Sequence, residues 1–313
     1  MATKIAEGVY EIDTRLGGWD HLTAGYLLTG DAPALIEVGS QSSTQAVLDE
    51  LAGLGLGAAD LAYVAVTHIH LDHAGAVGDI AAAYPNAKVV VHEKGARHLA
   101  SPDRLIASAS MVYGELLDTL YGRMSATDAA RITVAGDGDF IDLGGGHSIE
   151  VIDSPGHAKH HLGFFDPVSG LVFTGDAAGV LLPEVRNLRP ATPPADFDLE
   201  AGLRSLEKFR ARNPMGLAFA HYGLFTNPGE LLDEAEESLI KWAEVAEGAY
   251  KSQADMVTAL TTEFNVNLEG ASKEAMERFE MLNSIHSNAA GLTLWLERGG
   301  TTAHAHEIIH HHL

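Results

Sequence analysis

The chain has 313 residues, of which 46% are hydrophobic, and can therefore bury a sizeable core in one large α/β unit or in two domains. Its 20 Lys and Arg against 43 Asp and Glu leave a formal net charge of −23, which would repel nucleic acid and anionic membrane surfaces, so we expect neither as a partner. There is no cysteine, which excludes disulfides, thiolate metal sites and cysteine nucleophiles and leaves His and carboxylates as metal ligands.

No apolar core of signal-peptide length occurs at the start, and no window approaches the roughly 18 apolar residues that a membrane span needs, so we expect a cytoplasmic protein.

The N-terminal part of the chain predicts a meander of short strands. A helix bounded by a Ser/Thr cap and by glycines follows the meander, and a further strand comes next. The predicted strands are 9–13, 24–30, 34–39 and 61–66, and the predicted helix is 43–55.

The middle of the chain predicts strands that alternate with helices. The segment 101–131 is predicted to be helical, because apolar residues recur at steps of three and four, a pattern that favours core packing over a substrate cap. These residues are Met111, Tyr113, Leu116, Leu117, Leu120, Tyr121 and Met124. The remaining predictions are strands at 87–93, 139–152, 162–166, 171–175 and 217–220 and a helix near 198–212.

From Asn227 to about Arg298 the pattern is wholly helical. We therefore predict a catalytic domain over 1–226 and a helical C-terminal extension over 227–313 that ends in a His-rich tail. An apolar stripe near the start of this extension must be covered, either by the rest of the chain or by a second subunit in a homodimer. The HEIIH string at 306–310 matches a helical zinc motif, but we interpret the tail histidines as solvated. They are His304, His306, His310, His311 and His312.

The stretch THIHLDHAG at 67–75 places three histidines and an aspartate directly after an apolar strand. Three later strands also end in such groups, in the strings SPGH, TGD and AFAH. Loops at the carboxyl ends of strands gather at one edge of an α/β sheet, so these side chains can meet there. The candidate metal ligands are His68, His70, Asp72, His73, His157, Asp176 and His221.

Seven ligands are too many for one tetrahedral ion, but they suit two divalent ions that share a carboxylate and a bridging hydroxide. Five imidazoles and two carboxylates favour Zn²⁺, and Fe, Mn or Co would fit the same donors. A single histidine such as His221 is more often a structural residue than a ligand. The H-x-H-x-D-H string is different, because no packing or capping reason explains four such groups on one loop.

The four strings, in this order and at these intervals, resemble the metallo-β-lactamase superfamily over about residues 5–226. The resemblance implies an αββα four-layer sandwich in α/β class. It also implies a first metal site of His68, His70 and His157 and a second site of Asp72, His73 and His221, with Asp176 as the bridge. His161 and Thr67 match outer-shell positions of the family.

The resemblance implies a metal-dependent hydrolase, and the ligand set predicts a binuclear one. We expect the leaving group to be neutralised by the second metal or by a proton that Asp72 passes on, which makes Asp72 the candidate catalytic residue. Because basic residues are few, we expect a small uncharged ester, thioester or lactone as the substrate. The tyrosine typical of the lactonase branch would fall on Gly179, which weakens an acyl-homoserine lactonase hypothesis. The alternatives are a mononuclear iron persulfide dioxygenase-like oxidoreductase and a phosphodiesterase that uses the same metal site.

Overall fold

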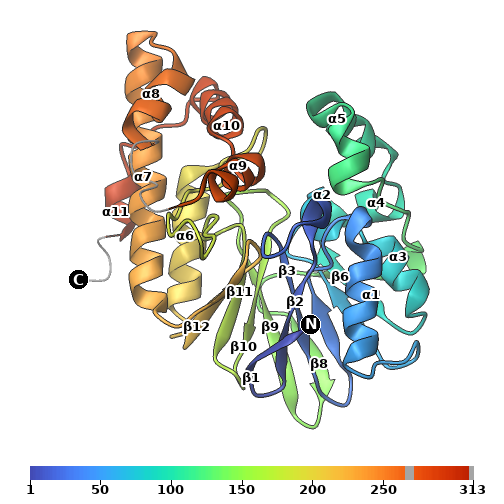
Figure 1. The fold of residues 1–313 in the computed structure, drawn as a ribbon. Coiled ribbons are helices and arrows are strands. Elements are labelled where there is room, and N and C mark those ends of the chain that lie inside the picture. The colour runs from blue at the N-terminus through green and yellow to red at the C-terminus, as the bar shows by residue number, and fades with distance from the viewer. Residues whose placement is uncertain (265–270, 310–313) are drawn as a thin grey trace.

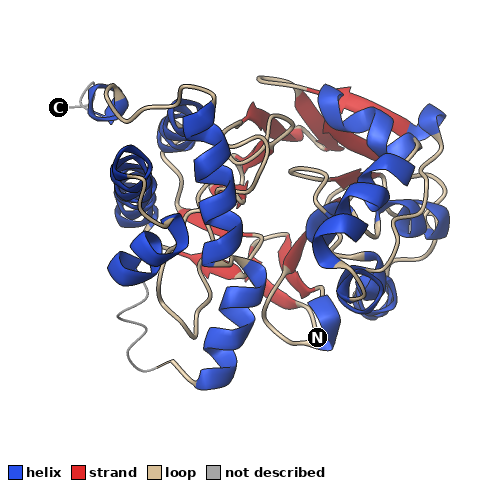
Figure 2. Cartoon of the chain, turned by 90° about the horizontal axis from the view of Figure 1, so that it is seen from above, coloured by secondary structure: helices blue, strands red, loops and turns tan. Residues whose placement is uncertain are grey.

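The protein folds into four layers, in which two β-sheets face each other and helices cover the outer face of each sheet (Figure 1). The computed structural model describes residues 1–264 and 271–309. The strands lie in the middle with helices on both sides in the view from above (Figure 2). This αββα arrangement confirms the fold class predicted from the sequence.

The first sheet is mixed, and its strands follow chain order from one edge to the other. β1 to β4 pair antiparallel, which confirms the predicted meander, whereas β4 to β7 pair parallel. The carboxyl ends of the parallel strands therefore share one edge, where the His-rich loop begins. The strands are β1 (Thr3–Ala6), β2 (Val9–Asp13), β3 (Ala24–Leu28), β4 (Ala34–Ile36), β5 (Tyr63–Ala65), β6 (Lys88–His92) and β7 (Ile132–Ala135).

The second sheet has the strand order β13-β12-β11-β10-β9-β8. Its neighbours pair antiparallel except for β11 and β12, which are parallel and are joined by the crossover helix α6. The strands are β8 (Phe140–Gly144), β9 (His147–Asp153), β10 (Leu162–Asp166), β11 (Leu171–Gly175), β12 (Gly216–Phe219) and β13 (Gly223–Phe225).

Apolar side chains fill three interfaces between the layers. Tyr26 and Phe164 belong to the core between the sheets, Val47 to the core under the helices of the first sheet, and Leu203 to the core under α6. These cores bury the apolar face of every layer, as a layered α/β fold requires. The helices up to α6 are α1 (Thr44–Gly53), α2 (Leu71–Ala74), α3 (Val77–Ala83), α4 (Glu93–Ala100), α5 (Asp103–Tyr113) and α6 (Leu199–Arg210), with short 3₁₀ turns at Leu16–Gly18, Gln41–Ser43 and Ala129–Arg131.

The segment 101–131, predicted to be helical, is helical only in part. The segment contains α5, a short π-helical stretch at Leu117–Tyr121 and irregular backbone after it. Gly114 and Gly122 follow the two helical pieces with φ of +55° and +69°. A positive φ ends the helical path and suits glycine, so these two residues divide the segment.

The apolar stripe of this segment is divided in the same way. Leu117, Tyr121 and Met124 are buried in the core of the first sheet, in agreement with the packing interpretation. Met111 and Leu116 are 83% and 58% exposed, so for them that interpretation is wrong. No residue of α5 is fully buried, and only partly buried side chains of this helix, which lies at the top of the molecule, pack against that core (Figure 1).

The C-terminal part is helical, as predicted. α7 packs along α6, and α8 and α10 pack against α7 (Figure 1). The stripe that includes Leu232, Leu239 and Trp242 is buried there, so this chain itself covers it. The division into domains 1–226 and 227–313 stays a prediction. The helices are α7 (Pro228–Ser252), α8 (Met256–Phe264), α9 (Lys273–Leu282), α10 (Ile285–Glu297) and α11 (Ala305–Ile309).

The tail and the helix lengths bear on two further expectations. His304 and His306 are exposed, and His306 Nε2 lies 3.0 Å from Glu244 Oε1. His310, His311 and His312 lie outside the described residues, and with them the last residue of the HEIIH string. Within residues 1–264 and 271–309, no helix combines the length and the apolar character that crossing a bilayer requires.

Candidate metal centre

The seven predicted ligands come together at one edge of the two sheets. His68 and His70 lie on the loop after β5, and α2 carries Asp72 and His73. The other three come from the ends of strands in the second sheet: His157 from the loop after β9, Asp176 from the residue after β11, and His221 from the turn between β12 and β13. The rule that ligands gather beyond strand ends therefore holds across both sheets.

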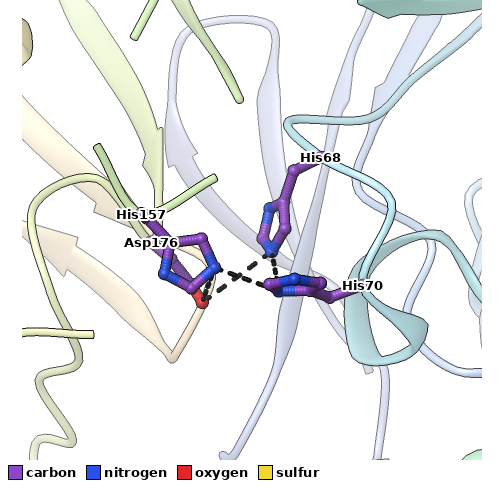
Figure 3. A group of neighbouring side chains, drawn as sticks. All are labelled: His68, His70, His157 and Asp176. Atoms are coloured by element: carbon purple, nitrogen blue, oxygen red, sulfur yellow. Dashed lines mark hydrogen bonds and ion pairs between the residues drawn. The ribbon is translucent and has the colours of Figure 1, made fainter. Parts of the chain in front are cut away.

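The first group consists of His68, His70, His157 and Asp176, whose ligand atoms all lie within 4.8 Å of one another. His70 Nδ1 is 2.9 Å from His68 Nε2 and 3.0 Å from His157 Nε2 (Figure 3). Asp176 Oδ2 lies 3.5 Å from His157 Nε2 and 3.9 Å from His68 Nε2. Three ring nitrogens and one carboxylate oxygen thus converge on a common point, as the donors of a tetrahedral metal site do.

The second group consists of Asp72, His73 and His221. His73 Nε2 and His221 Nε2 lie 3.5 and 3.6 Å from Asp72 Oδ2. The same nitrogens lie 3.5 and 3.4 Å from Asp176 Oδ1. Because the other oxygen of Asp176 faces the first group, this carboxylate lies between the two groups.

Two buried atoms of the centre lack any hydrogen-bond partner, namely His73 Nε2 and Asp176 Oδ1. An unpaired buried polar atom is costly, so a native site needs a partner for each. Both atoms point at the second group, and His70 Nδ1 faces two ring nitrogens at once although it can serve only one as donor or acceptor. Divalent cations among these donors would satisfy every one of these atoms, so the residues fit metal binding.

The two groups have opposite protonation behaviour. Burial and the neighbouring imidazoles hold the pKa of His68 well below its ordinary value, and burial with His157 lowers the pKa of His70 to about 4. Burial would also lower the pKa of His73, but the carboxylates of Asp72 and Asp176 outweigh it and raise that pKa well above the ordinary value. The imidazoles of the first group are therefore neutral and can accept a cation directly. The second group must release protons before a cation can bind there.

A residue that the sequence analysis missed orients the second group. Glu37, one residue after β4, is 2% exposed, and its Oε2 accepts the Nδ1–H of His73 at 2.7 Å. Its Oε1 accepts the backbone N–H of Thr67 at 2.6 Å. Like the predicted ligands, Glu37 is a polar residue directly after an apolar strand, in the string ALIEVG, so the same signal could have found it.

His161 and Thr67 lie behind the ligands. His161 Nε2 accepts the backbone N–H of Asp176 at 3.1 Å, and Thr67 Oγ1 lies 3.0 Å from His68 Nδ1. Gly175 separates them with φ of +51°, and a Cβ there would lie 2.5 Å from His161 Nε2. The TGD string therefore needs glycine at its second position, so that Asp176 can approach the histidines.

A pocket of about 260 Å³ opens beside the two groups. Its floor includes His70, Asp72, His157 and Asp176. One wall comes from α5 and the π-helical stretch, and the facing wall comes from the loop at 191–194 and from α9 and α10. In Figure 1 these two walls stand on opposite sides of the strand ends.

Comparisons with known proteins agree with this geometry. The protein ST1585 of Sulfurisphaera tokodaii, described as containing a metallo-β-lactamase fold, is 34% identical over 167 residues, which are 52% of this chain and 61% of that protein. Its crystal structure superposes with a TM-score of 0.69 and 25% identity, covering 91% of this chain and 98% of the other. The N-acyl homoserine lactonase AttM of Azorhizobium caulinodans is 30% identical over 135 residues, or 42% of this chain and 47% of AttM.

In sequence, the chain spans less than two thirds of the length of these curated relatives. The sequence model of the metallo-β-lactamase superfamily matches residues 18–221, which hold all seven predicted ligands. The match, the four layers and the His and Asp groups agree with one another. The chain belongs to the metallo-β-lactamase superfamily.

Proposed function

We propose that this chain is a two-metal hydrolase that cleaves a small, uncharged ester or thioester, with a lactone as a weaker candidate. The observation that carries the proposal is the position of Asp176, whose two oxygens face the two ligand groups separately. Superfamily membership and these groups suggest a metal-dependent hydrolase. Zn²⁺ suits imidazole and carboxylate donors best, and Fe or Mn would use the same side chains.

Two divalent ions held there would supply a nucleophile at neutral pH, because coordination lowers the pKa of a bound water towards about 7. Asp72 reaches both the pocket and the second group, since its side chain is 17% exposed and its Oδ2 faces His73 and His221. Burial raises the pKa of Asp72, but the charges of His73 and His221 outweigh it and hold that pKa below the ordinary range. An ionised Asp72 has no proton of its own, so we assign it the role of accepting the proton of the attacking water and passing it to the leaving group.

The lining of the pocket supports an uncharged substrate. Leu105, Val112 and Tyr113 line one wall, and Pro193 and Leu282 line the other. No Lys or Arg of the described chain lines it, so nothing but bound cations would attract an anionic substrate. An apolar slot beside a few polar groups fits a small acyl compound.

The similarity to AttM supports a lactone less strongly than its name suggests. Gly179 occupies the position where the lactonase branch carries a tyrosine, and it has φ of +89°. A Cβ at this residue would lie 2.7 Å from the carbonyl oxygen of Arg189, so no tyrosine fits there. Any phenol near the substrate must instead come from Tyr113 or Tyr121, which line the α5 wall with ring centroids 4.6 Å apart.

A reporter screen tests the proposal. The zinc-loaded protein is assayed on neutral ester, thioester and lactone reporters and on an anionic phosphodiester, and we expect the ester or thioester to give the highest kcat/KM. Asp72→Asn should lower kcat at least 100-fold, because the substitution removes the proton carrier and weakens metal binding by the second group. Asp49→Asn, on the exposed face of α1, is the matched control and should leave kcat unchanged. Absence of turnover on all reporters would contradict a hydrolase.

A charge swap tests the substrate class. Val112 is 75% exposed and lines the pocket, whereas the neighbouring Met111 is 83% exposed and does not line it. Val112→Lys should raise kcat/KM on the anionic reporter several-fold, while Met111→Lys adds the same charge with little effect because salt screens it. Equal effects of the two substitutions, or a parent that already prefers the anionic reporter, would contradict an uncharged substrate.

Metal analysis separates the hydrolase from the iron oxidoreductase. The first group alone could hold one iron, since it contains three imidazoles and a carboxylate. We expect two ions per chain after zinc loading and no oxygen uptake on a persulfide. One iron per chain together with oxygen uptake would replace the proposal by the oxidoreductase.

A further inference from the structure

Helices α9 and α10 meet the loop after Asp176 through a buried polar network. Asn283 and Asn288 are 5% and 1% exposed. Asn283 Nδ2 donates to the carbonyl oxygens of Arg189 at 3.3 Å and Pro190 at 3.1 Å. Asn288 Nδ2 donates to Asn283 Oδ1 at 2.6 Å. The two hydrogen-bonded amides therefore act as one unit that holds the backbone of the loop.

The same two amides also hold the loop at Thr192. The backbone N–H and the hydroxyl of Thr192 both donate to Asn288 Oδ1, at 2.7 and 2.8 Å. A Cβ at Gly291 would lie 2.0 Å from the carbonyl oxygen of Thr192, so the backbone of α10 lies directly against the loop. Arg189 adds a bond from its Nη1 to the carbonyl oxygen of Asn283 at 2.7 Å.

Ala191 lies between Pro190 and Thr192, the two residues held by these amides, and its carbonyl oxygen accepts the Nδ1–H of His157 at 3.1 Å. A proton on Nδ1 leaves the lone pair on Nε2, which is the atom that faces Asp176 and His70. The orientation of this imidazole thus depends on a carbonyl group whose flanking residues are held by Asn283 and Asn288.

We propose that Asn283 and Asn288 are positioning residues of the first metal group, which act on His157 through the backbone of residues 189–192. The C-terminal helices then complete the metal centre and do not merely cover the second sheet. Outer-shell partners of this kind tune metal affinity. The inference depends on metal binding and not on the substrate, so it can fail or hold independently of the proposed hydrolase activity.

The test measures the affinity of each ion in the full-length protein. The metal-free protein is titrated with Zn²⁺ against a chelating indicator, and with Co²⁺ while its visible spectrum is recorded. Asn288→Ala should weaken the first group between about 10-fold and 100-fold and change its Co²⁺ spectrum, with the second group unaffected. Leu260→Ala is the matched control, because Leu260 is fully buried in the same helical core but contacts no part of the loop network through a hydrogen bond.

Leu260→Ala should lower the melting temperature without changing either affinity. If it weakens the first ion as much as Asn288→Ala, or if Asn288→Ala binds both ions like the parent protein, the network only stabilises the helices and the proposal is wrong. Thr192→Val and Thr192→Ser decide the matter if Asn288→Ala does not fold. Val removes the hydroxyl that donates to Asn288 and should weaken binding of the first ion several-fold. Ser keeps this hydroxyl and should bind the first ion like the parent protein. Equal affinities of the two variants would overturn the proposal.

Discussion

The two metal groups lie side by side, yet opposite parts of the chain support them. In the first group, His157 is oriented by a carbonyl in the loop that α9 and α10 hold. In the second group, His73 is oriented by Glu37, directly after β4, and His221 by the carbonyl oxygen of Leu22, in the loop before β3. Substitutions far from the centre should therefore affect one ion and leave the other.

The electrostatic environments of the groups differ as strongly as their supports. In the first group, burial and the neighbouring imidazoles make protonation unfavourable, so the pKa values of His68 and His70 are lowered. Carboxylates surround the imidazoles of the second group, so the pKa values of His73 and His221 are raised. A cation in the first group would therefore meet neutral imidazoles, whereas a cation in the second group would have to displace protons.

The largest effect is expected where the two groups meet. Asp176→Ala removes the oxygen that faces His157 and the oxygen that faces His221, so both ions should bind more than 100-fold more weakly. Equilibrium dialysis with metal analysis measures this. Loss of only one ion would show that the carboxylate belongs to one group and does not link them.

A second substitution should separate the groups. Glu37 accepts one hydrogen bond from Thr67 N–H and one from His73 Nδ1–H. Glu37→Gln has the same shape but only one oxygen, so one of these donors must face an amide NH₂. We expect the second ion to bind about 10-fold to 100-fold more weakly and the first to bind normally. An equal loss of both ions would remove the distinction between their supports.

The pH dependence of binding should separate them as well. A raised pKa means that metal-free His73 is protonated at neutral pH; this contribution to folding stability is complete below the unfolded value of about 6.5 and is lost as pH rises through the folded value. The second ion must displace that proton, so its affinity should fall about tenfold per unit of pH below the raised pKa. His70 stays neutral until about pH 4.

On acidification from neutral pH, the second ion should therefore leave before the first. Dialysis against zinc buffers at a series of pH values checks this order. Simultaneous loss, or loss of the first ion alone, would contradict the electrostatic difference between the groups.

The sequence predicts most of the fold because the interior strands and long helices carry strong patterns. β10, β11 and α6 lie close to their predicted ranges. The strands that the sequence analysis missed are β1, β7 and β13, and each lies at an edge of its sheet. Edge strands are buried on fewer sides, and exposed positions in β1 and β7 weaken the alternation on which the prediction depends.

The sequence also predicts which side chains meet at the centre, because a polar residue after an apolar strand is a local signal. The structure brings all seven of them together. The support of His157 has no such signal. Its partner is the backbone carbonyl of Ala191, and the amide that fixes the neighbouring Thr192 lies 96 residues away in the sequence. A backbone acceptor carries no residue identity, so only the folded chain reveals it.

The smallest predicted effect concerns Thr67, whose hydroxyl lies 3.0 Å from His68 Nδ1. Thr67→Val keeps the shape of this buried side chain and removes the hydrogen bond, at a cost of about 1 kcal/mol in folding stability. His68 would keep its position through packing, since it is fully buried, but its ring would lose the partner that fixes the proton on Nδ1. The first ion should therefore bind only a few-fold more weakly, and the second ion should not change.

Thr29→Val is the control, because the Thr29 hydroxyl donates to the carbonyl oxygen of Gly8 at the end of β3 away from the metal centre. It should cost similar stability without changing either metal affinity. If Thr67→Val weakened the second ion more than the first, the hydroxyl would act through the neighbouring backbone N–H that Glu37 accepts, and the two supports would be coupled at the one residue that contacts both.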